Sequence, residues 1–154
     1  MPVALVFEIE GEKHIERTLM VSSEKLKTYY KPLQKSADLL LSDIDQAFQS
    51  EGAIFGGWAP LSPRYEAWKS RHFPGRGILE RTGKMRGGFR KEVGTRELVI
   101  SNPLEYFRFH QSRMPRTKMP RRVMLFIRNV TKENIVKFFQ EYIQEATADW
   151  GRIK

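Results

Sequence analysis

Two segments of the chain carry apolar residues at the spacing of an amphipathic helix. The first runs to about Ser50, and Pro32 must either open this helix or kink a longer one. Ser22 and Ser23 are its predicted N-caps, ahead of Glu24. One stripe of the helix holds Leu33, Ala37, Leu40, Ile44, Ala47 and Phe48.

The second helical pattern starts at Thr131 and closes the chain. Its apolar face comprises Ile135, Phe138, Phe139, Tyr142, Ile143, Ala146 and Trp150. We expect each helix to bury this face in the core and leave the opposite face in water.

Alternating apolar and polar positions predict two β-hairpins. The first joins residues 4–10 to residues 13–21 through a Gly-Glu turn, and the second ends in residues 97–102 after a Gly-Thr turn. A further β-prone run, "VMLFIR", covers residues 123–128. The apolar candidates of the hairpins are Val6, Ile9, Ile15, Leu19 and Val21 in the first and Phe89, Val93, Leu98 and Ile100 in the second.

Three less regular segments connect these elements. Residues 53–77 predict an ordered loop with one helical turn, which Ser62 can cap and Pro63 can open. Residues 103–112 predict a brief helix, and residues 111–122 predict a basic loop or arm with two prolines. We therefore expect one α+β domain over residues 1–154, in which a mainly antiparallel sheet of four to five strands packs against two longer amphipathic helices.

Composition narrows the function. The 154 residues include no cysteine and three histidines, which excludes thiol catalysis and disulfides and makes a zinc site improbable; we expect no metal and no cofactor. The N-terminal residues do not resemble a signal peptide, and no window approaches about 18 apolar residues, so we expect no membrane association and a cytoplasmic protein.

The formal net charge of +9 is unevenly distributed. Residues 1–51 carry six Lys or Arg against nine Asp or Glu, whereas residues 52–104 carry ten against four and residues 105–154 carry eleven against five. A basic field of this kind attracts phosphate backbones or acidic protein surfaces.

No catalytic motif accompanies this charge. His14, His72 and His110 are the available bases, and the acids nearest to His110 in sequence are Glu105 and the distant Glu133. The glycine-rich "GILERTGKMRGG" lacks the spacing of a phosphate-binding or dinucleotide-binding loop. We therefore expect a protein that is not an enzyme, with His110 as a hydrogen-bonded structural residue.

Nucleic-acid binding is an open alternative. Basic residues alternate with Trp58, Tyr65, Trp68, Phe73 and Phe89, and such a surface could neutralise phosphates and stack on bases. The same pattern would also arise from a core of aromatic residues with a solvated basic rim. Composition does not decide between the two.

Five short motifs follow one another along the chain in a characteristic order. Their positions are Phe48, Glu51, Gly52, Trp58, Pro60, Leu61, Ser62, Tyr65, Lys69, Ile78, Leu79, Thr82, Gly83, Met85, Arg86, Tyr106, His110, Gln111, Pro120 and Arg121. This order resembles the phage virion morphogenesis family, the Mu-like tail completion proteins of long-tailed bacteriophages. The chain departs from the family pattern at Ser112 and Arg113, where we expect a glycine soon after the His-Gln pair.

The resemblance implies a non-enzymatic part that completes the tail or the head-tail junction, as several copies in a ring. The implied partners are other head-tail connector or tail proteins, with a possible non-specific DNA contact. The implied locations are the host bacterial cytoplasm during assembly and then the virion. A monomeric basic nucleic-acid-binding module is the alternative, and it would show strongly salt-dependent binding to DNA or RNA.

The predicted protein interface combines the loop around Trp58 with the basic arm. We expect Trp58 to bury against an adjacent subunit, and Arg81, Lys84 and Arg86 to remain free for an acidic neighbour or DNA. Leu79, Thr82 and Gly83 are interpreted as structural. The full predicted interface is Trp58, Pro60, Leu61, Tyr65, Arg81, Lys84, Arg86, His110, Gln111, Arg113, Arg116, Lys118, Arg121 and Arg122.

Overall fold

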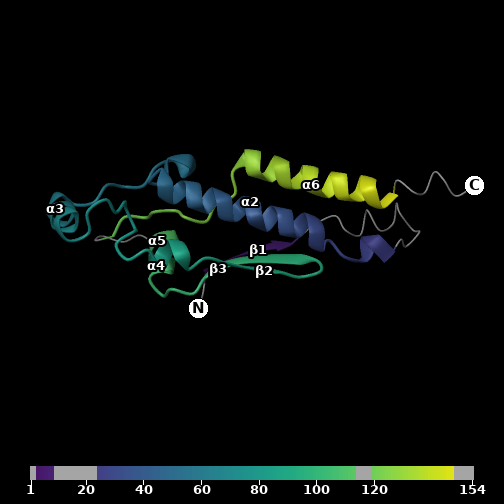
Figure 1. The fold of residues 1–154 in the computed structure, drawn as a ribbon, viewed down its shortest axis with the longest axis horizontal. Helices are drawn as coiled ribbons and strands as arrows, with labels where there is room; N and C mark the ends of the chain where they lie inside the picture. Colours follow the sequence, from purple (N-terminus) through teal and green to yellow (C-terminus); the bar gives the residue numbers. More distant parts are fainter. Residues whose placement is uncertain (1–2, 9–23, 114–118, 148–154) are drawn as a thin grey trace, which may run out of the picture.

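The computed structural model describes residues 3–8, 24–113 and 119–147. The molecule is elongated, with the long helix α2 (Tyr30–Gln49) along its axis. Helix α6 (Asn129–Thr147) lies on one side of α2 and a small sheet lies on the other (Figure 1). The buried apolar residues of these layers form one hydrophobic cluster.

Helix α2 confirms the predicted amphipathic pattern. Its stripe from Leu33 to Phe48 is buried, with every member of the predicted set at most 4% exposed. Pro32 lies in the first turn, where the helix needs no donor from its nitrogen, so this proline opens the helix and does not kink it. A short 3-10 helix, η1 (Glu24–Lys27), precedes it. The predicted caps Ser22 and Ser23 lie outside the described residues.

The sheet has the strand order β1-β3-β2 and both pairings are antiparallel. Strands β2 (Arg90–Val93) and β3 (Glu97–Asn102) form the predicted second hairpin, and β1 (Val3–Glu8) pairs with the other edge of β3. Leu98 and Ile100 are fully buried, so β3 supplies the apolar centre of the sheet. Residues 13–21, the predicted partner of β1, lie outside the described residues.

The α+β class is confirmed, but the sheet of four to five strands is wrong: the described residues contain one hairpin and one added strand. Residues 123–128, predicted as a strand, form an irregular connection. Met124 and Leu125 in it are buried, and the Gln111 side chain bonds the backbone N–H groups of both and the carbonyl of Leu125. The Gln111 side chain thus takes backbone hydrogen bonds of residues 124 and 125 that a strand partner would otherwise make.

Helix α6 is held to α2 by polar and aromatic contacts. Asp43 of α2 is 2% exposed and accepts hydrogen bonds from the Arg128 guanidinium and the Thr131 hydroxyl at the start of α6. Farther along, the Tyr29 ring packs against Phe139, with centroids 5.8 Å apart. Of the predicted face, Ile135 and Ala146 are buried, Phe138 and Ile143 are half-buried, and Trp150 lies outside the described residues.

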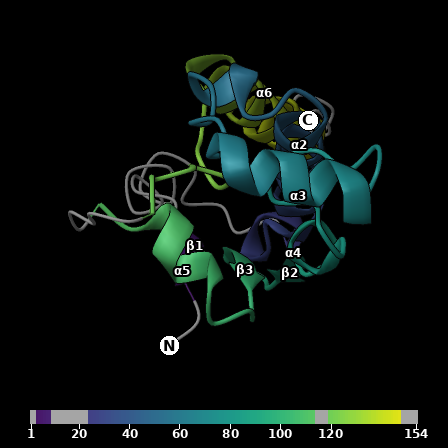
Figure 2. The same ribbon diagram turned by 90° about the vertical axis from the view of Figure 1, so that its left-hand side faces the viewer.

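The remaining elements gather at one end of α2. They are η2 (Ala53–Phe55), α3 (Pro63–His72), α4 (Lys84–Gly87) and the predicted brief helix α5 (Phe107–Gln111). Figure 2 looks onto this end and shows α3 in front, with α5 and α4 below it. The predicted loop at 53–77 therefore contains a ten-residue helix in place of the one expected turn.

Helix α3 begins as the sequence predicts. Pro63 is its first residue, and the Ser62 side chain accepts a hydrogen bond from the Tyr65 backbone N–H at 3.4 Å. None of the helices in the described part of the chain is both long enough and apolar enough to span a membrane.

Candidate functional site

The loop after α2 is anchored by a glycine and a tryptophan. Gly52 has φ of +80°, and a Cβ atom on it would overlap the Trp58 ring. That ring is 8% exposed, packs edge-on against Phe48 at 5.2 Å, and donates from Nε1 to the Val123 carbonyl at 2.7 Å. Trp58 therefore joins α2, the loop and residue 123 inside its own chain, and its indole is not a surface group, contrary to the expectation that it packs against an adjacent subunit.

Two buried cations hold the next part of the loop. Lys69 of α3 is 4% exposed and donates to the carbonyl of Gly77. Arg122 is 6% exposed, and its guanidinium donates to the carbonyls of Ala59 at 2.9 Å and Pro60 at 3.1 Å. Both side chains therefore bond to backbone carbonyls, and Arg122 is a packed residue and not part of an exposed arm.

Helices α4 and α5 are positioned by the end of β3. The amide of Asn102, which is fully buried, donates to the Met85 carbonyl at 2.9 Å and accepts from the Leu104 backbone N–H at 3.2 Å. Gly83 has φ of +74° and is the N-cap residue directly before α4, in agreement with its predicted structural role.

One predicted free cation is paired. Arg86 donates to Glu80 at 2.9 Å and to Asp45 at 2.7 Å, so the expectation that it stays available for a partner is wrong. These hydrogen bonds, first to Glu80 and then to Asp45, raise the pKa of the Arg86 guanidinium. Arg81 and Lys84, predicted in the same set, are exposed.

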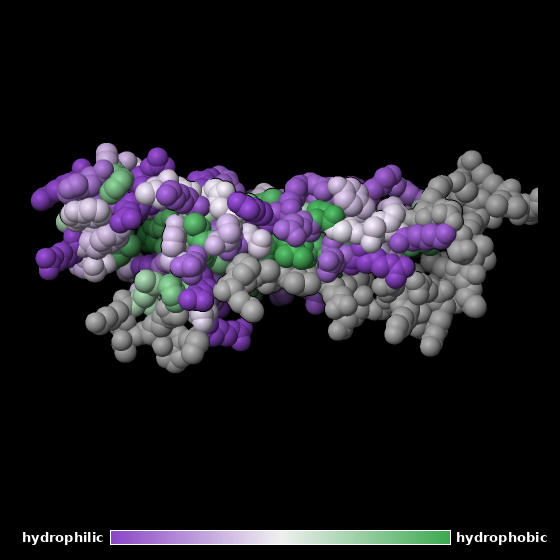
Figure 3. All heavy atoms as spheres, turned by 90° about the horizontal axis from the view of Figure 1, so that it is seen from below, coloured by the Kyte–Doolittle hydropathy of each residue, from purple (hydrophilic) through white to green (hydrophobic). Residues whose placement is uncertain are grey.

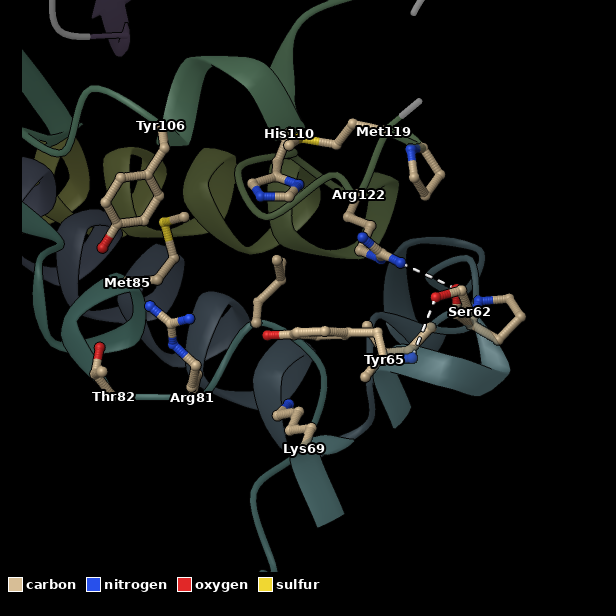
Figure 4. Close-up of a pocket in the computed structure, with 14 residues that line it drawn as sticks. Ser62, Tyr65, Lys69, Arg81, Thr82, Met85, Tyr106, His110, Met119 and Arg122 are labelled. Carbon is tan, nitrogen blue, oxygen red and sulfur yellow. Dashed lines mark hydrogen bonds between the residues drawn. The ribbon is translucent and has the colours of Figure 1, made fainter. Parts of the chain in front are cut away.

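A pocket of about 630 Å³ lies where α3, α4 and α5 meet (Figure 4). In Figure 4 the Tyr65 ring lies in the middle of the pocket, with Arg81 on one side and Arg122 on the other. Seen from below, hydrophobic residues lie among hydrophilic ones at this end of the molecule (Figure 3). The lining residues are Pro60, Leu61, Ser62, Tyr65, Lys69, Leu79, Arg81, Thr82, Met85, Tyr106, His110, Met119, Pro120 and Arg122.

Eleven of these 14 lining residues are positions that carry the family resemblance; the other three are Arg81, Met119 and Arg122. The eleven residues come from separate segments of the chain. The first and the last of them, Pro60 and Pro120, lie 60 positions apart. Three of the nine remaining motif positions, Phe48, Trp58 and Ile78, are buried in the core next to these segments. The motifs that are separate in sequence thus converge on one concave surface.

The pocket is electropositive. Its described lining contains three basic residues and no Asp or Glu. Burial lowers the pKa of the Arg122 guanidinium. Burial is also the largest influence on Lys69 and lowers its pKa, and the nearby charge of Arg122 acts in the same direction. Glu51 and Glu80 partly oppose this shift in the pKa of Lys69 from outside the lining.

An aromatic surface continues outward from the pocket along α3. Tyr65 and Trp68 are 38% and 40% exposed, and their rings stack with centroids 5.6 Å apart. The His72 ring stacks on the other side of Trp68 at 4.7 Å. These rings lie on α3, whose exposed positions form one tip of the molecule (Figures 1 and 2).

The predicted interface residues separate into groups. One group lines the pocket and consists of Pro60, Leu61, Tyr65, Arg81, His110 and Arg122. Arg121 donates to the Gln111 carbonyl at 3.1 Å, while the Gln111 side chain holds residues 124 and 125. Arg113 is exposed, and Arg116 and Lys118 lie outside the described residues.

The interface prediction missed several lining residues, among them Lys69, Leu79, Met85 and Tyr106. All four belong to the motifs that carry the resemblance, so the motif positions as a set predict the pocket better than residue types typical of interfaces do.

No protein-family model, curated protein or solved structure matches the chain.

Proposed function

We propose that this protein is a non-enzymatic bacteriophage assembly protein that completes the tail or the head-tail junction through ring-type contacts between proteins. The observation that supports the proposal is the convergence of the motif positions. Residues such as Tyr65, Leu79 and His110 come from three separate motifs and line one pocket.

This convergence is expected of a shared functional surface. The positions that line the pocket come from separate chain segments, and a shared contact surface would bring them together in this way. Here the polar positions inside the motifs also have defined partners: Glu51 accepts from the Ile78 backbone N–H at 3.0 Å, and Lys69 bonds Gly77. The motifs therefore specify the shape of this end of the molecule.

A protein contact suits this end better than a chemical reaction does. The pocket is open beside the exposed Tyr65 and Trp68 rings, and aromatic and arginine side chains are the types enriched at the energetic centres of interfaces. In a closed ring two different faces of each subunit contact its copies, and the α3 end would supply a further contact, to another head-tail or tail protein.

The composition of purified particles tests the proposal. In cells that carry the coding sequence within a phage or prophage genome, heads, tails and complete virions are separated on a density gradient and analysed by mass spectrometry. We expect the chain in tails or complete virions, in a constant ratio to the other tail proteins. Its absence from every particle fraction would refute the proposal.

The basic charge keeps a monomeric nucleic-acid-binding module as the second candidate. Within the described residues, however, several cations are engaged internally, including Arg86 with Asp45 and Arg128 with Asp43. Light scattering on the purified chain, at low and physiological salt, with and without a generic duplex DNA, separates the candidates. Tight complexes that dissociate as salt rises would favour the module, whereas a discrete oligomer or a monomer indifferent to DNA at physiological salt is the expected result.

A further inference from the structure

We propose that the pocket between α3, α4 and α5 binds an acidic peptide segment of a neighbouring protein, in which a carboxylate lies beside an apolar side chain. The inference deepens the proposed function, on which it rests for the source of the peptide. The chemical type of the expected peptide is inferred from the lining of the pocket alone.

The charge of the lining favours an anion. Arg122 is 6% exposed, and among the residues that the structure describes its guanidinium bonds to carbonyls and to no carboxylate. A buried cation without an anionic partner is unfavourable, because backbone carbonyls replace its hydration only in part. Lys69 and Arg81 add positive charge to the same lining, and the nearby Glu51 and Glu80 offset part of the charge of Lys69. A carboxylate that enters the pocket would gain attraction from all three in a partly desolvated site.

The remaining lining favours an apolar side chain next to that carboxylate. Aliphatic and thioether groups in the lining come from Leu61, Leu79, Met85 and Met119. A pocket of about 630 Å³ lies within the range of sites that take a small ligand or a few side chains. The peptide would therefore place one or two apolar side chains against these residues.

Leu79 supplies an independent indication of a binding site. Its φ is +64°, a left-handed conformation that is unfavourable for a residue with a bulky side chain. Such strained residues cluster at ligand sites, where the surrounding structure holds them. The side chain of Leu79, the residue with this strained backbone, lines the pocket.

A peptide fits the site better than a nucleic-acid backbone does. Duplex binding depends on exposed cations that reach successive phosphates. Of the three basic residues in the described lining only Arg81 is exposed, whereas Lys69 and Arg122 are 4% and 6% exposed. Buried cations in a concave site are within reach of a single inserted carboxylate and not of a regular row of phosphates.

Selection from a library of short random peptides, displayed and panned on the purified full chain, tests the inference. We expect the enriched sequences to carry Asp or Glu beside Leu, Met or Phe. Synthetic peptides of those sequences are then titrated by calorimetry. Arg81→Glu and Tyr65→Ala should each weaken binding by at least about tenfold, because the first reverses the one exposed cation among the described lining residues and the second removes the central ring.

The matched control is Arg90→Glu, which makes the same charge change at an exposed position of β2 outside the pocket and should alter binding by less than about twofold. The inference would be overturned if no peptides were enriched, or if the enriched peptides lacked acidic residues. It would also be overturned if Arg81→Glu bound the peptide as tightly as the wild-type chain does, or if a short duplex DNA displaced the peptide completely at physiological salt. Enriched sequences that reproduce this chain would identify a second copy as the occupant and would also overturn it.

The outcomes remain distinguishable from those of the proposed function. A chain that is present in virions but binds no acidic peptide would refute the pocket assignment alone. A chain that binds such peptides but is absent from every particle would refute the assembly role and leave the pocket assignment in place.

Discussion

Gly52 occupies a position at which any side chain would meet the Trp58 ring. Two separate features require glycine there: the left-handed φ of +80° and the close approach of the indole. The consequence is that the loop leaves α2 in one direction and buries Trp58 against Phe48.

We predict that Gly52→Ala destabilises the protein by about 3 kcal/mol, measured by urea unfolding followed by circular dichroism. The loss combines the cost of a left-handed alanine, about 1–2 kcal/mol, with the displacement of a packed ring, about 1–3 kcal/mol. Gly56→Ala is the matched control, because Gly56 has φ of +96° but nothing within 4 Å of the position of a Cβ. It should lose only the first contribution, and equal losses in the two variants would contradict the packing argument.

At the residue scale the sequence identifies important residues more reliably than it predicts the role of each one. It predicts Trp58 on a surface, yet the fold uses its ring in the core and its N–H on the Val123 carbonyl. It predicts a free Arg86, and this side chain bridges Asp45 and Glu80. Both errors have the same physical origin: amphipathic side chains are equally suited to surface and interior, and only the tertiary neighbours decide between them.

Helix α3 depends on its N-cap more than a longer helix would. It has ten residues, and Lys69 is its one buried residue, so packing contributes little to its stability. We predict that Ser62→Ala weakens α3 locally by about 1 kcal/mol, because the Tyr65 N–H loses its acceptor. Amide hydrogen exchange in residues 66–72 should accelerate by about fivefold.

Ser70→Ala is the control for this measurement, since Ser70 lies exposed within the same helix and alanine has the higher helix propensity there. It should leave the exchange of α3 unchanged or slow it slightly. Faster exchange in Ser70→Ala than in Ser62→Ala would show that the cap does not stabilise this helix.

Helices α2 and α6 are coupled through Asp43. This carboxylate is 2% exposed and accepts from Arg128 and Thr131, both near the start of α6. We predict that Asp43→Ala lowers the free energy of unfolding by about 3 kcal/mol, because it leaves a partly buried guanidinium and a buried hydroxyl without their acceptor.

Asp38→Ala is the corresponding control on the exposed side of the same helix. Asp38 pairs with Lys91, and its side chain is 59% exposed, so its loss should cost less than about 1 kcal/mol. Chemical denaturation of both variants checks the difference, and similar losses would mean that Asp43 does not couple the two helices.

At the element scale periodicity predicts the two long helices and the second hairpin, because each has a clear apolar face. It also predicts a strand over residues 123–128, since an apolar run has the same pattern whether it pairs or only packs. The distinguishing feature is the distant Gln111, whose side chain takes the hydrogen bonds that a neighbouring strand would have made. A long-range side-chain contact of this kind leaves no local pattern.

At the scale of the whole molecule, the elongated arrangement brings the motif segments together at one end of α2, opposite the end of α6 that leads to the C-terminus (Figure 1). The order of the motifs along the chain is enough to suggest the family resemblance and the function proposed from it. It does not indicate the pocket, because that requires α3, α4 and α5 to meet, and three short helices joined by loops carry no sequence pattern that determines their packing.

The measurement that tests the assembly role most directly is a count of joined particles by electron microscopy after the coding sequence is deleted from its phage or prophage genome. We predict that filled heads and tails accumulate separately, and that the wild-type chain supplied from a plasmid restores joined virions. Joined, infectious virions at the normal frequency in the deletion strain would contradict the account.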